Sequence, residues 1–366
     1  MITYSEIHKW DNLLLAHRYA SKGKRGKKAA ASFEFKLEDN LLSIQDDLFH
    51  KTYQPSGYSN FYIHEPKRRL ISAAIFRDRV VHHALCNIIS PFIEKSFIHN
   101  SYANRVGKGT HRAIAKAQEF SRKYEYVLPC DIRQFFPSMD HEVLHAILSK
   151  KIKDSDILWL INIILKSGQN ILKSEYTTKW FPGDDLLAVS RPRGLPIGNL
   201  TSQFWANCYL NPIDHFIKRE LRCCAYLRFA DDMLLFDNQK KELWHYKNEL
   251  IKRLMKFRLT IHENSAQVRP VTEGIPFLGF LIYPNKKRLK RRKGIYYARK
   301  FKSLAKEYNS GKIPLSKLTT SAQGWAAHAS HGDTKGLRRS ILSKVKLLSR
   351  NTIQQQSGSG IGGLGA

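Results

Sequence analysis

The sequence is short of acidic residues and has no long apolar run. Its 366 residues include 31 Asp and Glu against 61 Lys and Arg, which leaves a formal net charge of +30. This excess is far beyond what solubility requires and favours a large polyanionic partner such as nucleic acid. No segment approaches the roughly 20 uninterrupted apolar residues that span a bilayer, and residues 1–10 lack a basic start followed by an apolar stretch. We therefore expect a nucleic-acid-binding protein of the cytoplasm.

Cysteine is also scarce. The five cysteines form no C-x-x-C pair and have no histidine nearby at zinc-finger spacing: Cys86, Cys130, Cys208, Cys223 and Cys224. This pattern favours buried free thiols over a zinc site or a disulfide framework.

Three shifts in composition suggest boundaries in a chain long enough for two or three domains. Residues 22–28 are basic and interrupted by glycine, after a short helical start. Residues 286–293 contain seven basic residues in eight, followed by Tyr296 and Tyr297. Such a run can be a solvated face, but basic charge beside aromatics also suits a nucleic acid backbone. Residues 357–366 are rich in Gly and Ser and uncharged, so we expect a disordered tail.

Periodicity indicates a mixed α/β protein. An apolar stripe behind a capping Asp140 predicts a helix over residues 140–152. Short runs at 126–128, 224–229, 233–236 and 276–283 are typical of strands. These runs predict an antiparallel sheet.

Three aspartates follow or interrupt these strands. Asp231 and Asp232 separate two short apolar runs and would lie at the tip of a hairpin, although an ordinary turn also favours Asp. Asp131 ends the run that begins at Tyr126. If the strands are neighbours, three carboxylates meet, and this much negative charge favours Mg²⁺, which prefers hard oxygen ligands. We expect Asp131 and Asp231 to bridge two Mg²⁺ ions and Asp232 to be an auxiliary ligand.

Another acidic pair, Asp184 and Asp185, follows Pro-Gly without a preceding strand. We interpret this pair as a loop feature and leave it out of the catalytic set.

Taken in order, the segments from about Phe61 to Ile341 resemble the motifs of reverse transcriptases. The resemblance implies a right-hand polymerase of class α/β (α+β), with fingers, a palm whose antiparallel sheet carries the aspartates, and a helical thumb. It implies RNA-directed DNA polymerase activity with an RNA template, a DNA or RNA primer and dNTPs as partners. The corresponding domains are a helical, basic extension (1–60), fingers and palm (61–285), thumb (286–350) and a disordered tail (351–366).

The fingers motif of that family resembles residues 66–80, which implies that Lys67 and Arg69 bind the incoming triphosphate; a solvated basic turn is the alternative. Residues 100–110 are similar to the next motif and imply that Arg105 and Lys108 contact template or primer phosphates. Phe136 matches the steric gate, a ring that excludes a ribose 2′-hydroxyl, unless it only packs in the core.

The stretch 193–203 resembles the reverse transcriptases of diversity-generating retroelements. Most reverse transcriptases have Gln where this chain has Ile197, and Ser202 and Gln203 follow, with a 180–186 segment upstream that fits the same subgroup. Ile197 and Gly198 are implied nucleotide contacts, and Ser202 and Gln203 template or primer contacts. Those enzymes misincorporate opposite template adenine and work with a small accessory oligomeric protein. A branched aliphatic in place of an amide would remove a hydrogen bond near the new base pair.

Residues 274–283 resemble the primer grip, where Gly279 allows close backbone approach. The preceding segment lacks the lysine that is thought to protonate pyrophosphate, so His262 is a weak candidate for that role. Residues 321–341 resemble the thumb helices, with Trp325 as an anchor. His328 and His331 suit packing better than metal binding, because no Cys or carboxylate accompanies them.

Two alternatives remain open. One is a defence-associated or group II intron-like reverse transcriptase. The other is a non-catalytic RNA-binding protein of polymerase fold, although the presence of all three carboxylates speaks against lost catalysis.

Overall fold

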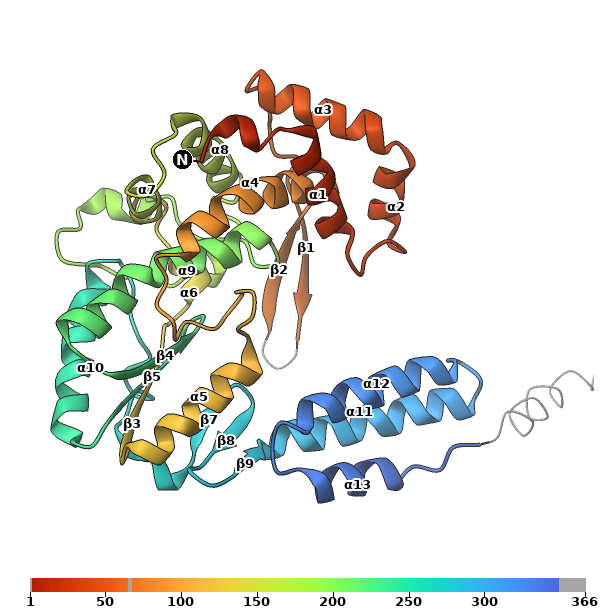
Figure 1. Cartoon of the computed structure of the whole chain (residues 1–366), viewed down its shortest axis with the longest axis vertical. Coiled ribbons are helices and arrows are strands. Elements are labelled where there is room, and N and C mark those ends of the chain that lie inside the picture. The colour runs from red at the N-terminus through yellow and green to blue at the C-terminus, as the bar shows by residue number, and fades with distance from the viewer. Residues whose placement is uncertain (1, 65–67, 349–366) are drawn as a thin grey trace, which may run out of the picture. The chain divides into compact units, whose positions relative to one another are not determined.

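The computed structural model describes residues 2–64 and 68–348 (Figure 1). Lys67 and the expected tail at 351–366 therefore lie outside the described residues. The chain divides into two units, which we describe separately. The first unit contains Met1–Gly109, Leu128–Leu235 and Lys240–Val268; the second contains Thr110–Val127, Phe236–Gln239 and Arg269–Ala366.

The first unit is largely helical. Its helices are α1 (Trp10–Ser21), α2 (Lys28–Phe35), α3 (Leu37–Phe49), α4 (Phe76–Glu94), α6 (Phe135–Ser138), α7 (His141–Ser149), α8 (Ser155–Ser167), α9 (Leu200–His215) and α10 (Lys240–Met255). Helix α9 lies at the centre, against α4 and α7, and nearly all of its side chains are buried (Figure 1). Several of these buried residues are polar, among them Asn207 and Asp214, so they need hydrogen-bond partners inside the first unit.

The predicted antiparallel strands are present. Strands β1 (Tyr58–Ile63) and β2 (Arg69–Ala74) form a hairpin in which Tyr58 pairs with Ala74 and Ile63 with Arg69. A second sheet has the order β4 (Ala225–Phe229), β5 (Asp232–Asp237), β3 (Tyr126–Asp131) and β6 (Arg269–Pro270). In β4 and β5 the central residues are buried without alternation, so both faces of these strands are shielded from solvent. The expected mixed α/β class is confirmed.

The second unit combines a small sheet with helices. Its elements are α5 (Thr110–Lys123), β6, β7 (Ile275–Phe277), β8 (Phe280–Ile282), β9 (Lys287–Leu289), α11 (Arg291–Asn309), α12 (Leu315–Ala329) and α13 (Lys335–Ser343). Trp325 of α12 stacks on Tyr297 of α11, with ring centroids 4.3 Å apart and planes 3° from parallel. The anchoring role predicted for Trp325 is therefore confirmed.

Several local predictions can be compared directly with the structure. Asp140 caps α7, because its Oδ1 accepts hydrogen bonds from the backbone N–H groups of Glu142 and Val143 at 3.0 and 3.1 Å. Four of the five cysteines are buried as expected, but Cys224 is exposed, so the expectation was wrong there. Cys224 directly precedes β4 in a loop, where the chain has not yet entered the sheet. None of the helices in the described ranges has the length and apolarity that a bilayer span requires.

Candidate functional site

The hairpin between β4 and β5 presents Asp231 from a tight turn. Asp231 lies between the end of β4 at Phe229 and the start of β5 at Asp232. Ala230 has a positive φ of 53°, which is unusual for a residue other than glycine. The carbonyl of Ala230 accepts a hydrogen bond from Nη1 of Arg228 at 3.0 Å. This bond stabilises the strained turn from inside the protein and fixes the backbone that carries Asp231.

Arg228 is itself held by a fully buried network. Its Nε and Nη2 atoms donate to the two carboxylate oxygens of Asp214, on α9, at 2.8 and 2.7 Å. Tyr226 donates its hydroxyl to the same carboxylate at 2.7 Å, and Asn207 Oδ1 accepts from Arg228 Nη1 at 3.0 Å. Both members of the ion pair are inaccessible to solvent. A buried pair of this kind persists because every polar atom has a partner.

The other carboxylate, Asp131, is the last residue of β3. Its carbonyl accepts a hydrogen bond from the backbone N–H of His262 at 2.9 Å, and Arg133 donates its N–H to the carbonyl of Thr260 at 2.8 Å. The segment 260–262 therefore braces the end of β3. The side chain of His262 is exposed, so this bracing comes from its backbone.

Asp131 and Asp231 influence one another. Burial raises the pKa of Asp231, and the negative charge of Asp131 raises it further, whereas Arg69 and Arg228 oppose the shift. Strand β5, which follows Asp231, lies beside β3 in the sheet. The structure thus brings together two of the predicted carboxylates and the predicted triphosphate ligand Arg69.

A metal site needs more than two neighbouring carboxylates, because an ion is usually held by several ligands. Among residues 2–64 and 68–348 no three His, Cys, Asp or Glu side chains are placed so that they could hold a metal ion. The carboxylates of Asp131 and Asp231 nevertheless fit Mg²⁺ chemically, because their mutual repulsion favours a cation and their oxygens are hard ligands. Asp232, the first residue of β5, follows Asp231 directly and is half-buried.

The ring of Phe136 is partly accessible to solvent, whereas that of its neighbour Phe135 packs in the core. Phe135 is buried and Phe136 half-buried, and their ring centroids are 5.6 Å apart. The carbonyl of Phe136 accepts a hydrogen bond from the N–H of Leu195 at 3.0 Å. A steric gate at Phe136 would need such a ring, one that is not fully buried in the core.

The segment around Ile197 is clamped to β2. The N–H of Ser72 donates to the carbonyl of Ile197 at 2.8 Å. The buried amide of Asn199 accepts from the N–H of Ala74 at 2.9 Å and donates to the carbonyl of Ser72 at 2.8 Å. Ile197 is half-buried and Gly198 exposed. Because these bonds join the loop to the strand that begins with Arg69, the expected nucleotide contacts share one rigid support.

The predicted template and primer contacts differ in their burial and in their hydrogen bonds. Ser202 is buried and Gln203 half-buried in the first turn of α9. Arg105 donates to the carbonyls of Ile98 and Ser101 at 2.8 and 3.0 Å, and Lys108 to that of His99 at 2.8 Å.

Gly279 has a φ of 89° in the turn between β7 and β8. It belongs to the second unit, and its role at a primer stays a prediction.

The second acidic pair, Asp184 and Asp185, and the buried supports of the site compare differently with the prediction from the sequence. Asp184 accepts from the N–H of Phe181 at 2.9 Å and pairs with Arg191, so the acidic pair is a loop feature as predicted. The roles of Arg228, Asp214 and Asn199 were missed. The available signal was an arginine inside the apolar run of β4, which has to find a buried partner.

Comparison with known proteins supplies the remaining information. The family described as "Reverse transcriptase (RNA-dependent DNA polymerase)" matches residues 63–282. Nuclear intron maturase 1, mitochondrial, of Arabidopsis thaliana is 34% identical over 155 residues, which cover 37% of this chain and 22% of that protein. The group II intron-encoded protein LtrA of Lactococcus lactis subsp. cremoris is 26% identical over 183 residues, covering 49% of this chain and 28% of that protein.

The chain thus spans less than a third of the length of these curated relatives. Among solved structures, apo telomerase from Candida tropicalis aligns with a TM-score of 0.44 and 10% identity, over 65% of this chain and 49% of that one. The family match alone covers more than half of the sequence and includes both Asp131 and Asp231. The chain belongs to the reverse transcriptase (RNA-dependent DNA polymerase) family.

Proposed function

We propose that this chain is an RNA-directed DNA polymerase that extends a DNA or RNA primer along an RNA template with dNTPs. The observation that carries the proposal is the placement of Asp131 at the end of β3 and Asp231 in the turn before β5, the strand beside β3. Burial raises the pKa of Asp231, and the charge of Asp131 raises it further. Paired carboxylates at the ends of adjacent strands suit phosphoryl transfer, in which the protein contributes mainly positioning and charge.

The residues divide the work as follows. Asp131 and Asp231 would hold two Mg²⁺ ions between them, with Asp232 as a further ligand. When bound, such ions activate the attacking hydroxyl and stabilise the leaving pyrophosphate. Arg69, and Lys67 beyond the described residues, would bind the triphosphate, and the half-buried ring of Phe136 would exclude a ribose 2′-hydroxyl.

Primer extension on RNA with Mg²⁺ tests this function. Asp231→Asn keeps the size of the side chain but removes the charge, so the extension rate should fall by about 10³-fold or more, since a bound ion contributes several kcal/mol. Asp237→Asn, at the other end of β5, is the matched control and should extend normally. Full activity of Asp231→Asn would contradict the metal assignment. RNA binding without extension by the unmodified chain would favour a non-catalytic RNA-binding protein.

We further propose that the enzyme is error-prone at template adenines, as part of a diversity-generating retroelement. The support is Ile197, an aliphatic residue in a loop that two hydrogen-bonding residues clamp to β2. A cytoplasmic location and a small accessory oligomeric protein belong to the same proposal. Similarity to intron-encoded proteins favours the group II intron-like alternative.

Sequencing of the cDNA made by Ile197→Gln tests whether Ile197 causes errors opposite template adenine. We expect fewer errors opposite adenine, because the amide restores a hydrogen-bonding group beside the new base pair. Ile197→Leu, which keeps the aliphatic character, should leave the error spectrum unchanged. Equal error rates for both variants and the unmodified chain would remove Ile197 from the explanation.

A further inference from the structure

A pocket lies within the first unit, between the ends of α4 and α7 and the C-terminal half of α9. Its volume is about 610 Å³, and it shares no lining residue with the carboxylate pair. On α9 it is reached at Cys208 to His215, whereas the segment around Ile197 leads into the other end of the helix. At 1.5 Å per residue, Ser202 and His215 are about 20 Å apart along the helix axis. The pocket is therefore distinct from the polymerase site.

The charge of this pocket is entirely positive. Four basic side chains and one histidine line it, and no Asp or Glu does: Lys95, Lys150, Lys151, Arg219 and His215. In the part of the chain that the structure describes, none of the four basic side chains has an ion pair or a hydrogen bond. Lys95 and Lys150 are also the C-cap residues of α4 and α7, where a cation suits the helix dipole. Arg219 lies in the last turn of the π-helix Phe216–Glu220 that continues α9, so the same account applies to it, whereas Lys151 lies beyond the C-cap of α7.

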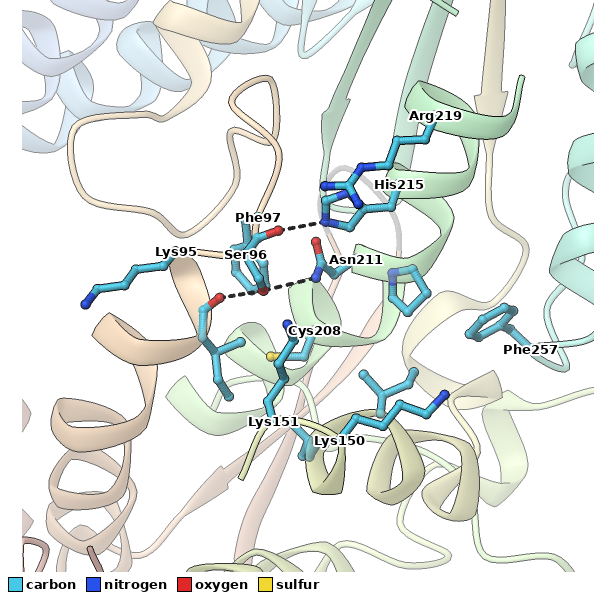
Figure 2. Close-up of a pocket in the computed structure, with 14 residues that line it drawn as sticks. Lys95, Ser96, Phe97, Lys150, Lys151, Cys208, Asn211, His215, Arg219 and Phe257 are labelled. Atoms are coloured by element: carbon cyan, nitrogen blue, oxygen red, sulfur yellow. Dashed lines mark hydrogen bonds between the residues drawn. The ribbon is translucent and has the colours of Figure 1, made fainter. Parts of the chain in front are cut away.

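Figure 2 shows how these groups are directed. The ammonium of Lys151 and the guanidinium of Arg219 extend toward the middle of the pocket, around Asn211 and His215. The ammonium of Lys95 extends away from it. An anion at the centre would therefore meet two cations at once, and its neighbours along a chain could meet Lys95 or Lys150 at the rim.

The floor of the pocket supplies hydrogen-bond acceptors. Asn211 is only 9% exposed; its Nδ2 donates to Ser96 Oγ at 3.2 Å, and its Oδ1 has no partner among the described residues. His215 Nε2 lies 2.8 Å from the carbonyl of Ser96. Because a carbonyl can only accept, Nε2 carries the proton, and the neutral ring has Nδ1 as an acceptor. A matching ligand has donor groups, such as hydroxyls, beside its negative charge.

An aromatic wall completes the site. Phe257 is half-buried and lines the pocket together with Pro212 and Ile147. Any of the four bases can stack on an accessible aromatic ring, because each has a flat π-face. Phosphate, sugar hydroxyl and base are the three parts of a ribonucleotide, and the RNA 2′-hydroxyl is the donor that DNA lacks.

We propose that this pocket binds an unpaired ribonucleotide of an RNA strand. The basic rim favours a strand over a free nucleotide, since Lys95 and Lys150 extend the positive charge beyond the two central cations. The site would hold RNA outside the polymerase site, so it does not depend on catalysis.

The test measures binding by the full chain, with Asp231→Asn included to show that the result is independent of polymerisation. Fluorescence anisotropy of a labelled 12-nucleotide unstructured RNA would compare Lys151→Gln/Arg219→Gln with Lys166→Gln/Lys241→Gln. The second variant removes the same charge from exposed positions on α8 and α10. The pocket variant should bind about tenfold more weakly than this control and lower the slope of log affinity against log salt by about 0.7, for the one phosphate contact that is lost.

Photo-crosslinking identifies the ligand source. RNA that contains 4-thiouridine should crosslink to the peptide that carries Phe257, and DNA of the same sequence with 4-thiothymidine should do so much less. Equal affinity and slope for the two variants would overturn the proposal. Efficient competition of the crosslink by millimolar AMP, with unchanged RNA affinity in the pocket variant, would instead assign the pocket to a free nucleotide and equally overturn it.

Discussion

At the scale of single residues, the candidate site depends on side chains that do not touch substrate. Asp131 and Asp231 could be predicted from the sequence, because each follows a short apolar strand. Arg228 and Asp214 could not be predicted as partners, since 14 residues separate them and only the packing of α9 under β4 brings them together. A charged residue inside an apolar strand is a usable signal of such a pair, although it does not identify the partner.

Arg228→Met should therefore be strongly destabilising. The substitution leaves Asp214 buried without a counter-charge and removes the hydrogen bond to the carbonyl of Ala230. Breaking a buried pair in this way costs about 3–5 kcal/mol, and urea unfolding would measure the loss.

The double variant Arg228→Met/Asp214→Leu is the matched control and should recover much of that stability, because both charges are then absent. Its polymerase activity should stay low, since the turn at Ala230 remains unsupported. A loss below about 1 kcal/mol in Arg228→Met, or full activity of the double variant, would contradict the role given to Arg228.

At the scale of elements, strands and capped helices were predictable, whereas contacts between distant segments were not. The helix after Asp140 and the strand pair around Asp231 depend on local patterns that the sequence displays directly. The clamp between β2 and the segment at Ile197 joins residues 125 positions apart through the amide of Asn199. Likewise, His111 stacks on His331 with ring centroids 3.4 Å apart, a contact that the spacing of His328 and His331 gave no means to foresee.

Glycine substitutions should distinguish the clamped loop from an ordinary helix. Gly198 has a φ of 119°, and a Cβ there would lie 3.0 Å from Cγ2 of Ile71 on β2. Gly198→Ala should cost about 1–3 kcal/mol, because it combines an unfavourable backbone conformation with a close contact.

Gly324→Ala is the opposite case. It lies within α12, where an added Cβ meets nothing within 4 Å, so the change should stabilise that helix by about 1 kcal/mol. Differential scanning calorimetry of both variants would test the contrast in sign. A stabilising Gly198→Ala would show that the segment at Ile197 is not held against β2 as the structure has it.

At the scale of the whole molecule, charge and histidine content have different consequences. The net charge of +30 predicts a polyanionic partner from composition alone, because a sum of charges does not depend on the fold. The response to acid cannot be predicted in this way. It depends on which histidines are buried, and only tertiary packing decides that. Burial lowers the pKa of His82 to about 3 and that of His83 to about 4, and it also lowers the pKa of His141.

These shifts fix the direction of the pH dependence. Near pH 6.5 and below, the unfolded chain binds protons at these positions that the folded chain does not, so stability falls as the pH decreases toward the folded pKa values. Above pH 6.5 the histidines are neutral in both states and their contribution is fully present. The raised pKa values of Asp78 and Asp231 act with the opposite sign at lower pH, so a single substitution is needed to isolate one histidine.

His82 is the suitable position, because its ring is buried and its Nδ1 has no partner among the described residues. His82→Leu removes the titrating group without breaking a hydrogen bond to Nδ1. Between about pH 7.5 and pH 5, this variant should lose about 2 kcal/mol less unfolding free energy than the unmodified chain, as follows from a pKa of about 3 against 6.5. Urea unfolding at the two pH values measures the difference. An identical pH dependence for His82→Leu and the unmodified chain would mean that His82 is protonated equally in both states, which burial in α4 does not allow.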